Sequence, residues 1–125
     1  MTIHEATFAT IDSLITDNAI LIIDFWAPWC GPCRSFAPIF EAAAEAHPDV
    51  TFAKANTEAD QQLGAYFQIR SIPTLMVFRE KILLFNQAGA LPRQALDELI
   101  AKVKTLDMAQ VHAEIAQSQT ENQQQ

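Results

Sequence analysis

The sequence has few of the features that several common classes of protein need. Its eight basic residues are outnumbered by fifteen acidic ones, which gives a net charge of −7. Nucleic-acid-binding proteins carry a basic face, and anionic membrane surfaces attract cations, so neither nucleic acid nor membrane is expected as a partner. No apolar run approaches the roughly 18 residues of a membrane-spanning helix.

The start of the chain, residues 1–5, has neither the basic residues nor the apolar core of a secretory signal. A cytoplasmic protein is therefore expected, although a mature chain that had lost its signal would look similar. A length of 125 residues fits one domain. Half of the residues are hydrophobic, which is enough for a substantial core.

Cysteine is scarce too, and both copies, Cys30 and Cys33, lie in one Cys-x-x-Cys pair. An apolar segment, residues 19–26, precedes the pair, and a helical pattern over residues 34–46 follows it. The pair therefore lies where a strand is expected to end and a helix to begin. Unpaired N–H groups and the positive end of the helix dipole stabilise a thiolate there. The pattern favours a redox-active pair that cycles between dithiol and disulfide.

Two other roles for the pair are less well supported. A zinc site needs four ligands, and the remaining candidates, His4, His47 and His112, are scattered without ligand spacing. No metal is therefore expected. A purely structural disulfide across so short a loop would stabilise the fold little, and such disulfides are rare in the reducing compartment that we expect.

The residues around the pair resemble the thioredoxin family. The matching motifs are Trp29-Cys30-Gly31-Pro32-Cys33, the preceding Asp24-Phe25-Trp26-Ala27, Lys54, Ile72-Pro73-Thr74 and Ala88-Gly89-Ala90. They cover roughly residues 8–104, and in this order they are far more specific than Cys-x-x-Cys alone. The resemblance implies the thioredoxin fold and activity as a thiol–disulfide oxidoreductase, a protein-disulfide reductase.

The hydrophobic pattern predicts an α/β fold with a central mixed β-sheet flanked by helices. The expected helices are residues 7–17, 34–46, a segment from 57 and a segment from 92, and the expected strands are 19–26, 50–56, 74–78 and 82–85. The last two strands form a hairpin. We expect a thioredoxin domain over residues 1–104, an extra C-terminal helix over 105–117 and a disordered Gln-rich tail over 118–125. Phe8, Phe25, Phe36, Phe40, Phe52 and Phe78 are expected in the core.

Cys30 is expected to be the nucleophile and Cys33 the resolving thiol, as the resemblance also implies. Cys30 attacks a substrate disulfide to form a mixed disulfide, and Cys33 then attacks Cys30 and leaves the pair oxidised. Gly31 and Pro32 add no charged or imidazole side chain that would further stabilise the thiolate. This favours a reductase over a disulfide isomerase.

Asp24 is an acid inside an otherwise apolar strand, so burial should raise its pKa. A raised pKa suits a general base that takes the proton from Cys33. A structural role fits the residues equally well, and the resemblance favours the base. Lys54 could modulate Asp24 or could simply reach solvent, and Trp26 is expected to pack in the core or support the active site.

The resemblance also implies a substrate-binding rim made of Trp29, Ile72, Pro73, Gly89 and Ala90. Its proline would follow a cis peptide bond and present the backbone of Ile72 to an extended substrate. The implied partners are disulfide-containing proteins and an NADPH-dependent thioredoxin reductase. No bound cofactor is expected, because the chain has no glycine-rich nucleotide loop, and the protein is expected to be a monomer.

Two rival functions stay open: a disulfide isomerase on the same fold, and a non-catalytic binding or chaperone module. The chain also departs from the family pattern. Ser71 replaces a glycine that many thioredoxins have next to the rim, and the turn at residues 79–81 lacks its usual glycine. Residues 83–85 are unusually apolar, which indicates a surface covered by the extra helix or by a partner.

Overall fold

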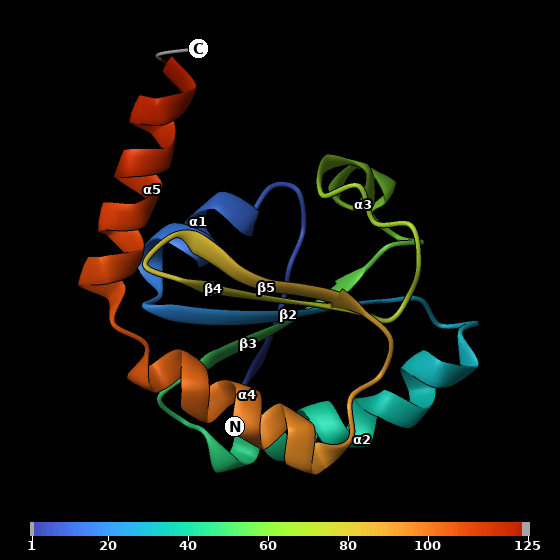
Figure 1. The fold of residues 1–125 in the computed structure, drawn as a ribbon. Helices are drawn as coiled ribbons and strands as arrows, with labels where there is room; N and C mark the ends of the chain where they lie inside the picture. Colours follow the sequence, from blue (N-terminus) through green and yellow to red (C-terminus); the bar gives the residue numbers. More distant parts are fainter. Residues whose placement is uncertain (1, 124–125) are drawn as a thin grey trace.

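The computed structural model describes residues 2–123, with the side chains of residues 2–120. Five strands form one mixed sheet in the order β1-β3-β2-β4-β5 (Figure 1). The strands are β1 (Ile3–Glu5), β2 (Ile20–Trp26), β3 (Thr51–Asn56), β4 (Thr74–Arg79) and β5 (Ile82–Ala88). The helices are α1 (Ile11–Asp17), α2 (Gly31–Ala46), α3 (Gln61–Tyr66), α4 (Arg93–Thr105) and α5 (Met108–Gln123). β1, β3 and β2 are parallel, whereas β4 is antiparallel to both β2 and β5. The predicted α/β fold class is confirmed.

The central strand β2 separates two apolar layers, because successive side chains of a strand point to opposite faces. Ile22 packs in a cluster with Phe36 and Phe40 of α2 and with residues of α4. Ile23 packs in a second cluster on the α1 and α3 side of the sheet. The alternation places Asp24 and Trp26 on the same face as Ile22, the face that α2 covers.

Several boundaries differ from the prediction. β1 was not expected, since three residues carry too little pattern, and it exists through parallel pairing with β3. α1 begins at Ile11 and not at Thr7, because Thr7 and Thr10 form a turn in which their side chains hydrogen-bond with each other. Phe8 is 41% exposed and does not belong to the core, whereas the other five predicted phenylalanines are buried.

The C-terminal segment is more helical than predicted. α5 continues to Gln123, so residues 118–123 are helical where a disordered tail was expected, and residues 124 and 125 lie outside the described residues. Asp107 accepts a hydrogen bond from the N–H of Gln110 at 3.2 Å, as its spacing indicated. α5 runs along the end of the molecule near the β4–β5 turn (Figure 1).

Arg79 joins this turn to the end of α4. Its guanidinium donates to the carbonyls of Val103 at 2.6 Å, Lys104 at 3.3 Å and Leu106 at 3.0 Å. These are carbonyls that have no partner within the helix at its C-terminal end. The adjacent turn residues Glu80 and Lys81 both have positive φ, which is the conformation of a two-residue hairpin turn.

The extra helix does not cover the apolar strand as was suggested. The side chain of Glu80 pairs with His112 of α5 at 3.1 Å, which fixes the helix beside the turn. Leu83 on β5 nevertheless remains 42% exposed. Within residues 2–123, no helix is long and apolar enough to cross a membrane.

Candidate redox site

Cys30 and Cys33 form a disulfide at the junction between β2 and α2, with their Cα atoms 5.2 Å apart. Cys30 is the N-cap residue of α2, and its Sγ accepts a hydrogen bond from the N–H of Cys33 at 3.2 Å. Pro32 fits the first turn because the N–H that it lacks would have no helical partner there. Both residues are buried, and Cys30 is slightly more accessible, with 5% of the residue exposed against 2% of Cys33.

The Ile72–Pro73 peptide bond is cis, as the resemblance implied. The carbonyl oxygen of Ile72 lies 3.8 Å from the Sγ of Cys30. The carbonyl of Pro73 accepts a hydrogen bond from the N–H of Gly89 at 2.8 Å. Gly89 has a φ of +104°, a conformation that favours glycine. Of the predicted rim residues, Ile72 lies beside Cys30, and Gly89 is hydrogen-bonded to Pro73, which follows Ile72. Ala90 is exposed.

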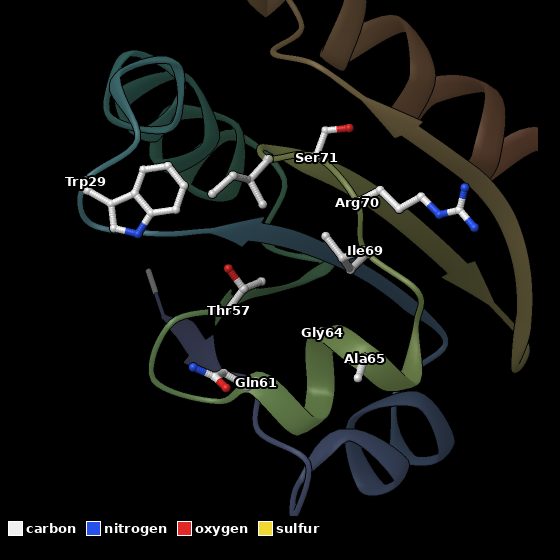
Figure 2. A pocket seen from close by; sticks show the side chains of 9 residues that line it. Trp29, Thr57, Gln61, Gly64, Ala65, Ile69, Arg70 and Ser71 are labelled. Atoms are coloured by element: carbon white, nitrogen blue, oxygen red, sulfur yellow. The ribbon is translucent and has the colours of Figure 1, made fainter.

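Trp29 is the most exposed large hydrophobic side chain that the structure describes, with 66% of the residue accessible. It forms one wall of a groove of about 400 Å³ (Figure 2). The other walls come from α3, from the loop before it and from the segment before the cis proline, and they comprise Thr57, Gln61, Gly64, Ala65, Ile69, Arg70, Ser71 and Ile72. The contribution of α3 was not predicted, since none of its residues carries a local signal of a binding role.

Asp24 is buried, with 1% of the residue exposed. Burial raises its pKa from 3.8 to about 7, and the nearby positive charge of Lys54 opposes part of this effect. Within the described part of the chain, neither carboxylate oxygen has a hydrogen-bond partner. The raised pKa expected from the sequence is therefore confirmed, and its cause is desolvation of the charged form.

Lys54 and Trp26 lie together near this acid. Lys54 is the register partner of Asp24 across β2 and β3, and its Nζ lies 4.5 Å from the centroid of the Trp26 ring. Trp26 in turn packs against the small cluster formed by Ala27, Cys30 and Cys33. The redox pair, the buried acid and the cation thus share the α2 face of the sheet.

Thr57 supports this group of residues and was missed by the sequence reasoning. Its backbone N–H and its hydroxyl both donate to the carbonyl of Trp26, at 2.9 Å and 3.1 Å. No pattern in the sequence distinguishes this threonine from any other loop threonine. Among residues 2–123, no group of three or more His, Cys, Asp or Glu side chains could hold a metal ion.

A family model described as Thioredoxin matches residues 2–102. The chain belongs to the thioredoxin family. It is 48% identical to a Streptomyces coelicolor protein that carries the name thioredoxin 2, over 94% of this chain and 87% of that protein. It is 35% identical to a thioredoxin of Mycoplasmoides gallisepticum, over 78% of this chain and 97% of that one. A Plasmodium falciparum thioredoxin structure has a TM-score of 0.74 at 32% identity, over 80% of this chain and 98% of that one.

Membership of the family establishes the chemistry of the site as thiol–disulfide exchange at Cys30 and Cys33. Thioredoxins typically reduce disulfide-containing proteins and are themselves reduced by thioredoxin reductase. The family match ends at residue 102, within α4. The match to the Streptomyces protein spans 117 residues, so it also includes most of the segment after residue 104 that contains α5.

Proposed function

We propose that this thioredoxin is a general protein-disulfide reductase in which Cys30 attacks the substrate and Cys33 resolves the intermediate. The observation that carries the proposal is the position of Cys30 at the start of α2, with the Ile72 carbonyl 3.8 Å from its Sγ. The helix N-terminus favours a thiolate at Cys30. Cys33 is less exposed than Cys30 and is placed to attack the sulfur of Cys30 in the mixed disulfide.

The reaction balances within the protein and its substrate. The Cys30 thiolate attacks one substrate sulfur, the substrate disulfide breaks, and the departing thiolate takes up a proton. The deprotonated Cys33 then attacks the Sγ of Cys30 and releases the second substrate thiol. Two electrons and two protons pass to the substrate, and the Cys30–Cys33 disulfide remains.

Asp24 is proposed as the general base for Cys33. It lies on the sheet face that α2 covers, and a pKa of about 7 leaves it able to take or give a proton near neutral pH. Lys54 favours the ionised form of the acid, and the Trp26 ring holds Lys54 in place. A water molecule would relay the proton between the thiol and the carboxylate.

The proposed substrate surface consists of Trp29, Ile72, Pro73, Gly89 and Ala90. An extended substrate segment would pair with the backbone of Ile72 and lie against the exposed Trp29 ring. This surface is largely apolar, which suits many partners. Gly31 and Pro32 carry no charge that would stabilise the reduced pair, which supports a reductase and not a disulfide isomerase.

We infer that an NADPH-dependent thioredoxin reductase recharges the protein in the cytoplasm, and that the protein is a monomer without a cofactor of its own. The net charge of −7 supports the absence of nucleic-acid and membrane partners. The reduction potential of the pair tests the direction of the chemistry. A value near the roughly −270 mV known for thioredoxin supports a reductase, and one near the −180 mV of the isomerases contradicts it.

Trapping experiments test the two cysteine roles. Cys33→Ser should accumulate a mixed disulfide between Cys30 and a substrate protein, because no thiol remains to resolve it. Cys30→Ser should accumulate none, and both variants should retain the circular-dichroism spectrum of the reduced protein. If Cys30→Ser bound the same partners as Cys33→Ser without forming a mixed disulfide, the protein would be a non-catalytic binding module.

A further inference from the structure

A second hollow, of about 160 Å³, adjoins the groove beside Trp29. Residues 69–71 line both spaces, so this segment forms the boundary between them. Asn86 and Ala88 of β5 form the opposite wall of the smaller space. Figure 2 shows that the side chains of Arg70 and Ser71 point away from Trp29. The smaller hollow is therefore a second space, separate from the groove, that could contact a side chain of a substrate.

Four polar side chains, all able to donate hydrogen bonds, line this hollow: Gln68, Arg70, Ser71 and Asn86. Among residues 2–120, no hydrogen bond or ion pair involves any of these four side chains. Thr74 also lines the space, but its hydroxyl is already used to donate to the carbonyl of Ser71. The hollow thus offers free donors and one cation.

No acidic residue lines the hollow or the groove beside it, and Arg70 is the one charged side chain of both linings in the described structure. This local positive charge contrasts with the net charge of −7 of the chain as a whole. A guanidinium recognises carboxylates well, because its N–H groups match the geometry of two carboxylate oxygens. The chemistry of the lining therefore fits a carboxylate.

The hollow lies within reach of a substrate bound for reaction. Arg70 is two residues before Ile72, whose carbonyl lies 3.8 Å from the Sγ of Cys30. An extended chain advances about 3.3 Å per residue, so two residues span about 7 Å. A substrate that runs beside residues 70–72 would place a side chain at the hollow within about two residues of its reacting cysteine.

We propose that Arg70, assisted by Ser71 and Asn86, selects substrates that carry a glutamate or aspartate close to the disulfide cysteine. The proposal rests on the proposed function, since it assumes that substrates align with the Ile72 backbone. Exposed ion pairs contribute about 0.2–1 kcal/mol, and 1.4 kcal/mol corresponds to a factor of ten. A carboxylate should therefore accelerate reduction by about 1.4- to 5-fold over its neutral amide.

The test uses peptides that carry one cysteine, linked by a disulfide to a chromophoric aromatic thiol, with both termini blocked. Glu, Gln or Lys is placed one or two residues before or after the cysteine. The pre-reduced full-length protein is mixed with each peptide, and release of the coloured thiolate gives the second-order rate constant. In at least one position, the rate should fall in the order Glu, Gln, Lys.

Arg70→Gln should bring the Glu-to-Gln rate ratio close to 1, and Arg70→Glu should bring it below 1. Lys102→Gln is the matched control, because it makes the same change in net charge on an exposed residue of α4, and it should leave the ratio as it is in the wild type. Raising the salt concentration to 1 M, where screening acts within about 3 Å, should shrink the wild-type ratio.

The outcomes separate the two proposals. A Glu-to-Gln ratio of 1 at every position, or a ratio that Arg70→Gln leaves unchanged, would overturn the role of Arg70 while leaving the reductase intact. Failure to reduce even the Gln peptides would instead contradict the proposed function. Thermal unfolding of the Arg70 variants confirms that each is folded before its rates are compared.

Discussion

Replacing Asp24 with asparagine should stabilise the protein in a way that depends on pH. Burial raises the pKa of this acid to about 7, against 3.8 when it is exposed. A difference of about 3 pKa units, at about 1.36 kcal/mol per unit, corresponds to about 4 kcal/mol. This is the free energy by which ionised Asp24 is disfavoured in the folded protein.

The sign follows from proton binding. Between pH 3.8 and about 7 the folded state keeps the proton of Asp24 while the unfolded state has lost it. The folded state therefore binds more protons, and the free energy of unfolding falls as pH rises through this window. Below pH 3.8 Asp24 is protonated in both states, and its burial then carries no cost of ionisation. Above about pH 7 it is ionised in both states, and the full cost of the buried charge lowers the free energy of unfolding.

The assay is urea unfolding of the oxidised proteins, in which Cys30 and Cys33 do not titrate, at intervals between pH 4 and pH 8.5. Asp24→Asn should differ little from the wild type at pH 4 and be more stable by about 4 kcal/mol at pH 8.5. Asp17→Asn, on the exposed end of α1, is the matched control and should show no comparable trend. A difference between Asp24→Asn and the wild type that stays constant with pH would refute the reasoning.

The same variant tests the proposed base. Asp24→Asn should slow resolution of the mixed disulfide by up to about 10²-fold at neutral pH and remove any step near pH 7 from the pH–rate profile. Unchanged rates together with the predicted gain in stability would mean that Asp24 is buried without acting in catalysis.

Two further predictions concern stability and can be checked by urea unfolding of the oxidised protein at pH 7. Gly89→Ala should destabilise the protein by about 1–2 kcal/mol, because a φ of +104° is unfavourable for a residue with a Cβ. Gly64→Ala, within α3, should instead stabilise it by about 0.5–1 kcal/mol, because the new Cβ would make only an ordinary contact with Thr57. Equal effects of the two substitutions would contradict the backbone argument. Arg79→Ala should cost about 1–3 kcal/mol, since it leaves the carbonyls at the end of α4 without their charged donor, and a loss below 0.5 kcal/mol would show that water replaces the guanidinium.

The sequence alone determined the chemistry of this thioredoxin because that chemistry is encoded locally. The two cysteines lie three residues apart, between a strand pattern and a helix pattern. This local order places them together at the N-terminus of a helix, where they form the disulfide. An acid within an apolar run such as Asp24 is buried once that run becomes the central strand. The order of helix and strand patterns was enough for the fold class.

Only the tertiary structure decided which distant residues meet at the site. The groove combines Trp29 with α3 and with residues 69–72, and no local signal marks Thr57 or Gln61 as residues that share a groove with Trp29. The short strand β1 likewise depends on pairing with β3, which lies about 50 residues further along. Such contacts come from long-range packing, which local pattern does not record.

The charge on Arg70 is visible in the sequence, but its freedom from any acidic partner is not, because ion pairs form between residues that the fold brings together. The course of α5 has the same origin: its polar sequence predicted a tail after residue 117, whereas the helix continues to Gln123. Its place beside the β4–β5 turn depends on Arg79 and on the pairing of Glu80 with His112.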